Sequence, residues 1–361
     1  IMKTKKSKLL VSLALILALT CSLTMTASAA TVKLQWWTLI DTGGHLDWQD
    51  DGTKYLSNWK SGIGLWNGYI PYVIREDTGS TINDVALSDV NEVNSINATT
   101  TWYTGLVEGT IKFNIYNMDK LTNSEKTAVA AHECGHCLGL GHNTSADIMY
   151  EYTPLVTQLS ANDKASYDAT WANFGRTPPT SRTATVESLS DQGMEATYLN
   201  GLPVYYSQSS YCIDVNNFED LAGHADYVFV GKVTAKLDEE YKNFVVLENE
   251  NGEYQWGDPY TNYQITVTDN LKGTLASNIQ LQQYGGLDQS GEFYTISEGT
   301  ELLAEETTYI FFAYAQADGS LLIRGQNSAI KYNQSTAEEI EEAVENQTPY
   351  VRTSYISDYE M

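Results

Sequence analysis

The sequence predicts an α+β protein in which a mixed domain of strands and helices precedes a β-rich domain. Segments with helical spacing and short strands alternate in the N-terminal half, whereas β-type runs separated by Gly, Asn and Asp turns fill the C-terminal half. The 361 residues are 42% apolar, which is enough for two hydrophobic cores. We expect a signal peptide at 1–29, a catalytic domain at 30–174, a linker at 175–200 and a β-rich domain at 201–361.

The first 29 residues have the pattern of a secretory signal. Four lysines up to Lys8 precede an apolar run from Leu9 to Leu19, and small residues end at Ala27-Ser28-Ala29. The apolar run is shorter than a membrane-spanning helix, and no later segment replaces it. We therefore expect a secreted, extracellular protein without a membrane span.

The charge of the chain is strongly acidic. The formal net charge is −25, and removal of the four lysines in the leader takes it to −29. Nucleic acid is therefore not an expected partner, because phosphate binding depends on Lys and Arg. The acidity is compatible with a Ca²⁺ site, although the loop Asp47-Trp-Gln-Asp50-Asp51-Gly52 lacks the ligand spacing of an EF-hand and otherwise reads as a solvated turn.

Cysteines do not build the fold. Cys134, Cys137 and Cys212 remain after the leader, an odd number that argues against a disulfide framework. The Cys-X-X-Cys spacing of the first two suggests a redox or zinc-knuckle motif, but no second pair completes a four-sulfur site. On a helix Cys134 and Cys137 would also point away from the neighbouring histidines, so we interpret both as buried packing residues.

The N-terminal half predicts one helix and several strands before the histidine motif. Tyr55, Leu56, Trp59, Ile63 and Trp66 fall on one face of a helix. Strands are expected at Leu34–Leu39, Pro71–Ile74, Asp84–Leu87, Ala98–Tyr103 and Gly109–Tyr116. In the last of these, apolar residues alternate with polar ones such as Lys112, which predicts a half-buried strand.

Two further helices follow. Thr122-Asn-Ser-Glu125 is a capping box, so a helix should begin near Asn123 and stop near Gly139, where a left-handed conformation costs little. Another helix is expected over Ser160–Trp171, and the two prolines of Arg176–Ser181 indicate an interdomain linker.

The C-terminal half predicts short strands and one helix. The strand candidates are Asp226–Val233, Tyr263–Val267, Ile279–Leu281 and Tyr309–Phe312. Ser335-Thr-Ala-Glu338 is expected to cap a short acidic helix that ends near Asn346.

Three of the five histidines lie within eleven consecutive positions, 132 to 142. His132 and His136 are four residues apart, so on a helix both can point at one metal ion, and Gly139 lets the chain turn so that His142 supplies a third ligand. Three neutral imidazoles suit Zn²⁺ and leave a fourth position for water, the pattern of a catalytic site. Glu133 lies beside them and is expected to act as general base toward that metal-activated water. Three unrelated histidines are the alternative interpretation.

The stretch His132-Glu-Cys-Gly-His136-Cys-Leu-Gly139-Leu-Gly-His142, followed by Ala146-Asp-Ile-Met149-Tyr150, resembles the metzincin metallopeptidases, and most of all the matrixin group. The resemblance implies that the three histidines bind zinc, that Glu133 is the base, and that Met149 lies under the site. It also implies that Ala98–Tyr103 is an edge strand that pairs with an extended peptide substrate, and that Tyr150 and Tyr152 lie at a substrate pocket. Matrixins commonly carry a proline two residues after the methionine, where this chain has Glu151.

The C-terminal half is similar to the OB-like barrel of netrin and tissue-inhibitor modules, without their cysteines. The similarity rests on Ala225–Val233, on Asp269-Asn-Leu-Lys-Gly273 and on Glu298-Gly-Thr-Glu-Leu-Leu before Tyr309. Such a domain could tether the enzyme, or contact the active site of its own chain. We therefore expect a secreted zinc endopeptidase that cleaves proteins or peptides. The alternative is a secreted binding or inhibitory protein that acts through the β-domain and has a self-blocked zinc site.

Overall fold

The computed structural model of the chain describes residues 30–361, with the exception of 79, 103–107, 180–196 and 250–251. The expected signal peptide and most of the expected linker lie outside these residues. Residues 32–361 form one compact unit. Among the described residues, no helix is both long and apolar enough to cross a membrane.

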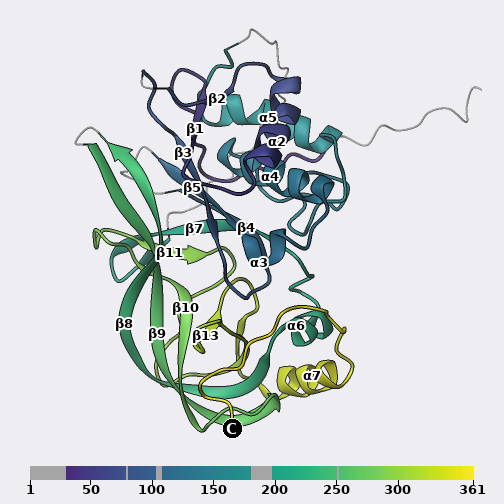
Figure 1. The fold of residues 1–361 in the computed structure, drawn as a ribbon, viewed down its shortest axis with the longest axis vertical. Coiled ribbons are helices and arrows are strands. Elements are labelled where there is room, and N and C mark those ends of the chain that lie inside the picture. The colour runs from purple at the N-terminus through teal and green to yellow at the C-terminus, as the bar shows by residue number, and fades with distance from the viewer. Residues whose placement is uncertain (1–29, 79, 103–107, 180–196, 250–251) are drawn as a thin grey trace, which may run out of the picture. The chain divides into compact units, whose positions relative to one another are not determined.

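The N-terminal part combines a five-stranded mixed sheet with helices. Strand β1 pairs in parallel with β2 and β3, β3 pairs in parallel with β5, and β4 runs antiparallel to β5. Figure 1 shows α2, α4 and α5 gathered beside these strands. The elements are β1 (Leu46–Asp50), α2 (Leu56–Tyr69), β2 (Ile74–Glu76), β3 (Val85–Val90), β4 (Ile96–Trp102), β5 (Gly109–Asn114), α3 (Ile115–Met118), α4 (Asn123–Cys137) and α5 (Ala161–Asn173).

Aromatic side chains fill the core between α2, α4, α5 and the sheet. Trp59 and Trp66 of α2 are completely buried, as the helical spacing of the sequence predicts. The Trp66 Nε1–H group donates a hydrogen bond of 2.9 Å to the Ala131 carbonyl of α4, which supplies the partner that a buried indole requires. This contact ties α2 to the residue just before the histidine motif.

Three expectations for the N-terminal strands are wrong. The strand expected at Pro71–Ile74 begins only at Ile74, because residues 71–73 form a turn. Leu34–Leu39 is not a strand: it forms an isolated bridge between Leu34 and Leu140, and the N–H groups of Gln35 and Leu39 donate to the carbonyls of Gly139 and Cys137. Strand β5 is not half-buried, because all six of its residues are buried. Lys112 can be buried because its ammonium group lies 2.8 Å from a carboxylate oxygen of Asp258, a residue that the alternating pattern of β5 could not reveal.

The C-terminal part contains a closed barrel of five strands. Strand β8 pairs with β9, β9 with β10, β10 in parallel with β13, β13 with β12, and β12 again with β8. The elements are β6 (Tyr198–Leu199), β7 (Leu202–Tyr211), α6 (Phe218–His224), β8 (Tyr227–Asn249), β9 (Gly252–Lys272), β10 (Asn278–Leu287), β11 (Tyr294–Ser297), β12 (Thr308–Ala315), β13 (Leu321–Ile323), β14 (Ala329–Lys331) and α7 (Gln334–Glu345).

The sequence predicts the place of these strands better than their length. Strands β8 and β9 extend over 23 and 21 residues and pair along a long ribbon that register shifts interrupt (Figure 1). Helix α7 is present, but Asn333 caps it in place of the expected Ser335 motif, because the Asn333 side chain accepts a hydrogen bond from the Thr336 backbone N–H.

Strand β7 joins the two parts. It pairs antiparallel with β4 on one side and in parallel with β11 on the other, so that the strands on both sides belong to one continuous sheet. A hydrophobic cluster crosses the same junction, because Ile96 of β4 packs in it with Tyr211 of β7 and Phe312 of β12. Consequently β4 is not an exposed edge strand, contrary to the expectation for Ala98–Tyr103.

Candidate active site

Helix α4 carries the first part of the site. Thr122 and Glu125 form the expected capping box, in which the Thr122 hydroxyl accepts from the Glu125 backbone N–H and the Glu125 carboxylate accepts from the Thr122 N–H. The helix ends at Cys137, and Gly139 follows with a φ of 94°, the left-handed conformation that glycine adopts most easily. The predicted turn at Gly139 is therefore confirmed, and it redirects the chain so that His142 returns toward the helix.

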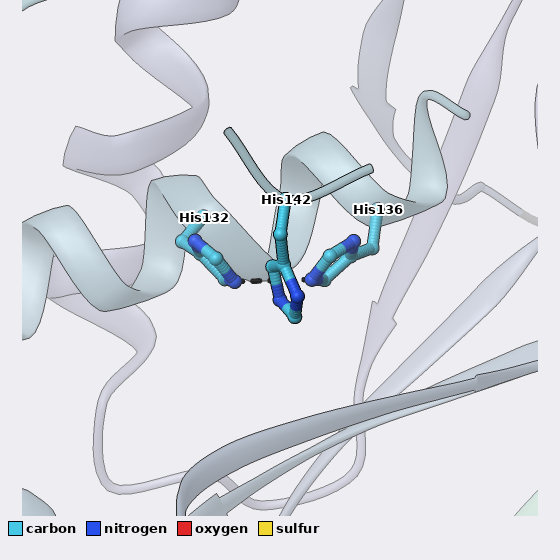
Figure 2. A group of neighbouring side chains, drawn as sticks. All are labelled: His132, His136 and His142. Carbon is cyan, nitrogen blue, oxygen red and sulfur yellow. Dashed lines mark hydrogen bonds between the residues drawn. The ribbon is translucent and has the colours of Figure 1, made fainter. Parts of the chain in front are cut away.

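The three predicted metal-binding histidines converge. His132 and His136 project from α4 and His142 from the following loop, so that their rings face one another (Figure 2). One ligand atom from each ring lies within 4.8 Å of the other two. His132 Nε2 and His136 Nε2 are 3.0 Å apart.

The hydrogen bonds of the rings show that these nitrogens carry lone pairs. His132 Nδ1 is 2.9 Å from the Ile148 carbonyl and His136 Nδ1 is 2.9 Å from the Leu140 carbonyl. A carbonyl oxygen can only accept, so each Nδ1 donates its hydrogen and each Nε2 is left as an acceptor. Two acceptors at 3.0 Å repel unless a cation lies between them, and the buried His142 Nε2 has no hydrogen-bond partner among the described residues. The donor set therefore fits a metal such as zinc.

Burial keeps the three imidazoles neutral. It lowers the pKa of His132 to about 4 and that of His142 to about 3, and it lowers the pKa of His136 well below the usual value. Metal ligation needs the neutral ring, so the site is ready to accept a cation without first losing protons.

Glu133 is completely buried next to the histidines. Its Oε2 accepts a hydrogen bond of 2.7 Å from the Thr100 hydroxyl, and its Oε1 accepts one of 2.7 Å from the Ser210 hydroxyl. Burial raises the pKa of Glu133 to about 7, although both hydroxyls oppose that shift. A carboxylate with this pKa can take up and release a proton near neutral pH.

Met149 packs against Gly135, the residue of α4 that directly precedes His136, and its place under a bound metal stays a prediction. A Cβ placed on Gly135 of α4 would lie 2.2 Å from the Met149 sulfur, so the missing side chain makes room for it. The Asp163 carboxylate of α5 accepts hydrogen bonds from the backbone N–H groups of Ile148 and Met149, at 2.9 and 3.2 Å. This contact fixes the turn beneath the site and was not visible in the sequence pattern.

The segment after Met149 forms a wall opposite β4. The rings of Tyr150 and Tyr152 are 5.1 Å apart, and the Tyr152 hydroxyl donates to Asp214 at 2.7 Å. Glu151, which replaces the common proline, places a carboxylate oxygen 3.9 Å from His142 Nδ1. Glu298 of the C-terminal part approaches the same nitrogen at 3.8 Å. The roles of Tyr150 and Tyr152 at a substrate pocket stay predictions.

The cysteines do not belong to the cluster of His132, His136 and His142. Cys134 and Cys137 are free, wholly buried and packed in the N-terminal core, as expected.

The residues of the expected calcium loop, 47–52, do not converge on one point; only Asp47 lies in a carboxylate group, in which one oxygen each from Asp41, Asp47 and Asp84 lie within 4.8 Å of one another. Asp47 forms a 2.6 Å ion pair with Arg75, Asp50 accepts from the backbone of Gly52 and Thr53, and Asp51 accepts from the Val246 N–H. These carboxylates are used within the fold, and calcium stays a prediction.

Two residues of the site, Thr100 and Ser210, were missed at the level of the sequence. They lie 33 and 77 positions from Glu133 in the chain. Nothing in the local pattern of a threonine-rich strand or of a Ser-Ser pair marks either residue. Only the pairing of β4 with β7 brings them to the carboxylate.

Part of the chain matches a known protein family. Residues 78–171 match the family model described as Matrixin. Comparison with curated proteins finds no significant match to the chain. The match covers the histidine motif, the turn methionine and most of the sheet described above, so residues 78–171 form a matrixin domain with its triad His132, His136 and His142.

Proposed function

We propose that the protein is a secreted zinc-dependent endopeptidase. The convergence of three neutral histidine side chains beside the buried Glu133 carries this proposal. The matrixin domain supports it, because that family suggests a zinc metallopeptidase that acts on proteins. Secretion rests on the signal-like pattern of residues 1–29 alone.

His132, His136 and His142 would hold the metal. Zinc bound there would lower the pKa of a water molecule and polarise the carbonyl of the scissile peptide bond. Glu133 then acts as general base at its carboxylate, taking a proton from the attacking water and later giving it to the departing amine nitrogen. Thr100 positions Glu133 through its 2.7 Å hydrogen bond.

An extended peptide would bind between β4 and the wall at residues 150–153. Once β7 has left β4, the backbone N–H and C=O groups of β4 would add the substrate as a further strand, and Tyr150 and Tyr152 would contact its side chains. This arrangement favours unfolded proteins and flexible segments as substrates, because a folded segment cannot present a free strand.

We also propose that the C-terminal barrel is an OB-like module and that a linker separates it from the catalytic domain. The ring of pairings β8-β9-β10-β13-β12-β8, closed by a parallel β10–β13 pair, supports an OB-like module. The catalytic domain would comprise 30–174, the linker 175–200 and the module 201–361.

The test uses the full chain loaded with zinc and a quenched fluorescent unfolded protein as substrate, with each substitution made both in the wild type and in a variant whose cleft is opened by displacing β7 from β4. Glu133→Gln is expected to abolish cleavage while the protein retains one zinc per chain, because the amide cannot accept the proton but leaves the histidines in place. Glu125→Gln, in the first turn of the same helix, is the matched control and should keep activity, because a glutamine oxygen can still accept the capping hydrogen bond from the Thr122 N–H. Zinc binding without any cleavage by the wild type or by a variant with an opened cleft would refute the proposal.

A further inference from the structure

The cleft between β4 and the wall at 150–153 is filled by the protein's own strand β7. On one side, Gln208, Ser209 and Ser210 pair antiparallel with Thr100, Thr99 and Ala98 of β4. On the other side, Tyr211 lies in parallel register with Tyr152.

Backbone hydrogen bonds fix β7 to the wall. The Tyr211 N–H donates to the Glu151 carbonyl and the Thr153 N–H donates to the Tyr211 carbonyl, both at 2.9 Å. Residues 208–211 therefore use the backbone groups on both sides of the cleft that an added peptide strand would need.

The Ser210 hydroxyl forms a hydrogen bond with Glu133, the proposed general base. This hydroxyl lies 2.7 Å from Glu133 Oε1, while Thr100 engages Oε2. Ser210 is completely buried, so water does not reach this oxygen. Each Glu133 oxygen therefore already accepts one hydrogen bond, and because Glu133 and Ser210 are both completely buried, the docked strand keeps an attacking water molecule away from the carboxylate. The position of Ser210 therefore blocks the chemistry at Glu133.

Buried charges hold the C-terminal part in this position. Arg324 Nη1 lies 2.7 Å from a Glu92 oxygen, and Arg324 Nη2 donates to the Thr99 hydroxyl at 3.1 Å. The buried Lys112–Asp258 pair connects β5 with β9 at 2.8 Å. If the two parts separated, both charges of each pair would have to be rehydrated together, because a buried charge without its partner is strongly destabilising. The ion pairs therefore hold the two parts in one defined, closed arrangement.

We propose that residues 207–211 are an intramolecular pseudosubstrate that holds the peptidase in a closed, inactive form. The inference rests on the proposed function of the site. The ligand of the cleft in this form is a Ser-Gln-Ser-Ser-Tyr strand of the same chain, and substrates enter only after β7 leaves β4.

A reversible crosslink between β4 and β7 tests the inference in the full chain. Thr99 and Ser209 are directly opposite and their hydroxyl oxygens are 3.1 Å apart, so Thr99→Cys with Ser209→Cys places two thiols at a distance suited to a disulfide. A Cys212→Ser background removes the one partly exposed thiol of the described residues. The reduced form of the same protein is the control.

The first readout is binding of a fluorescent peptide hydroxamate, a zinc-directed cleft ligand, and the second is substrate hydrolysis. Oxidation should weaken binding by about tenfold or more, because apparent affinity falls with the fraction of open molecules. Equal binding before and after oxidation would overturn the inference. Weaker binding after oxidation without hydrolysis in either form would uphold it and refute the peptidase proposal instead.

A second variant opens the cleft. Ser210→Trp cannot fit the closed site next to Glu133, so β7 should leave and both hydroxamate binding and hydrolysis should rise above the wild type. Circular dichroism and thermal unfolding check that the variant is folded. A folded Ser210→Trp protein that binds the hydroxamate no better than the wild type would contradict the proposal. This holds even if the crosslinked protein binds no hydroxamate.

Discussion

Gly62 and Gly64 lie two residues apart in α2 and allow a matched test of how this helix positions the site. A Cβ placed on Gly62 would lie 2.8 Å from the Ala131 nitrogen and 3.1 Å from the Thr127 carbonyl oxygen, both backbone atoms of α4. A Cβ placed on the exposed Gly64 would meet nothing within 4 Å. Alanine should therefore act differently at the two positions, although the helix is the same.

The expected magnitudes follow from these contacts. Gly64→Ala should raise the free energy of unfolding by about 1 kcal/mol, the gain in helix propensity. Gly62→Ala gains the same propensity but overpacks a backbone contact, which costs about 1–3 kcal/mol. The two variants should thus differ by about 1–3 kcal/mol in unfolding free energy, with Gly62→Ala the less stable.

Urea unfolding in the presence of a chelator measures this difference without a contribution from bound metal. Because Ala131 directly precedes His132, Gly62→Ala should also weaken zinc binding, whereas Gly64→Ala should leave it unchanged. Equal stabilisation by both alanines would refute the conclusion that close packing of α2 on α4 sets the position of the histidines.

Three further predictions concern buried polar groups. Glu92→Gln should destabilise the protein by about 3–5 kcal/mol in urea unfolding, because Arg324 keeps a buried charge without its partner; a loss below 1 kcal/mol would contradict this. Burial raises the pKa of Asp84 to about 8, above the value of about 3.9 in an unfolded chain. The folded state therefore retains a proton that the unfolded chain loses, and the free energy of unfolding should fall as pH rises from 4 to 8. Asp84→Asn should flatten this decline in thermal unfolding, and an unchanged profile would refute it. Thr100→Val should lower kcat/KM by about 10- to 100-fold with zinc retained, since Glu133 loses its orienting hydrogen bond; full activity would show that Thr100 does not position the base.

Local sequence signals predicted the elements that carry the three histidines of the site. The Thr122 capping box located the start of α4, and Gly139 marked its end. The spacing of four residues placed His132 and His136 on one face of the helix. These features succeed because capping, helical spacing and positive φ depend on residues within a few positions of one another.

Contacts between distant segments were not predictable in the same way. Lys112 looked like the exposed face of a strand until Asp258 supplied its buried partner. The chain also gives no local indication that Ser210 of β7 reaches Glu133. The register of two strands more than 100 residues apart depends on the packing of the whole junction, which periodicity does not encode.

X-ray absorption at the zinc edge, on the full chain loaded with one equivalent of zinc, tests the central claim most directly. Coordination by His132, His136 and His142 predicts three imidazole nitrogens at about 2.0–2.1 Å and no sulfur neighbour. A sulfur neighbour at about 2.3 Å would instead mean that Cys134 or Cys137 binds the metal, and it would contradict the arrangement of the site described above.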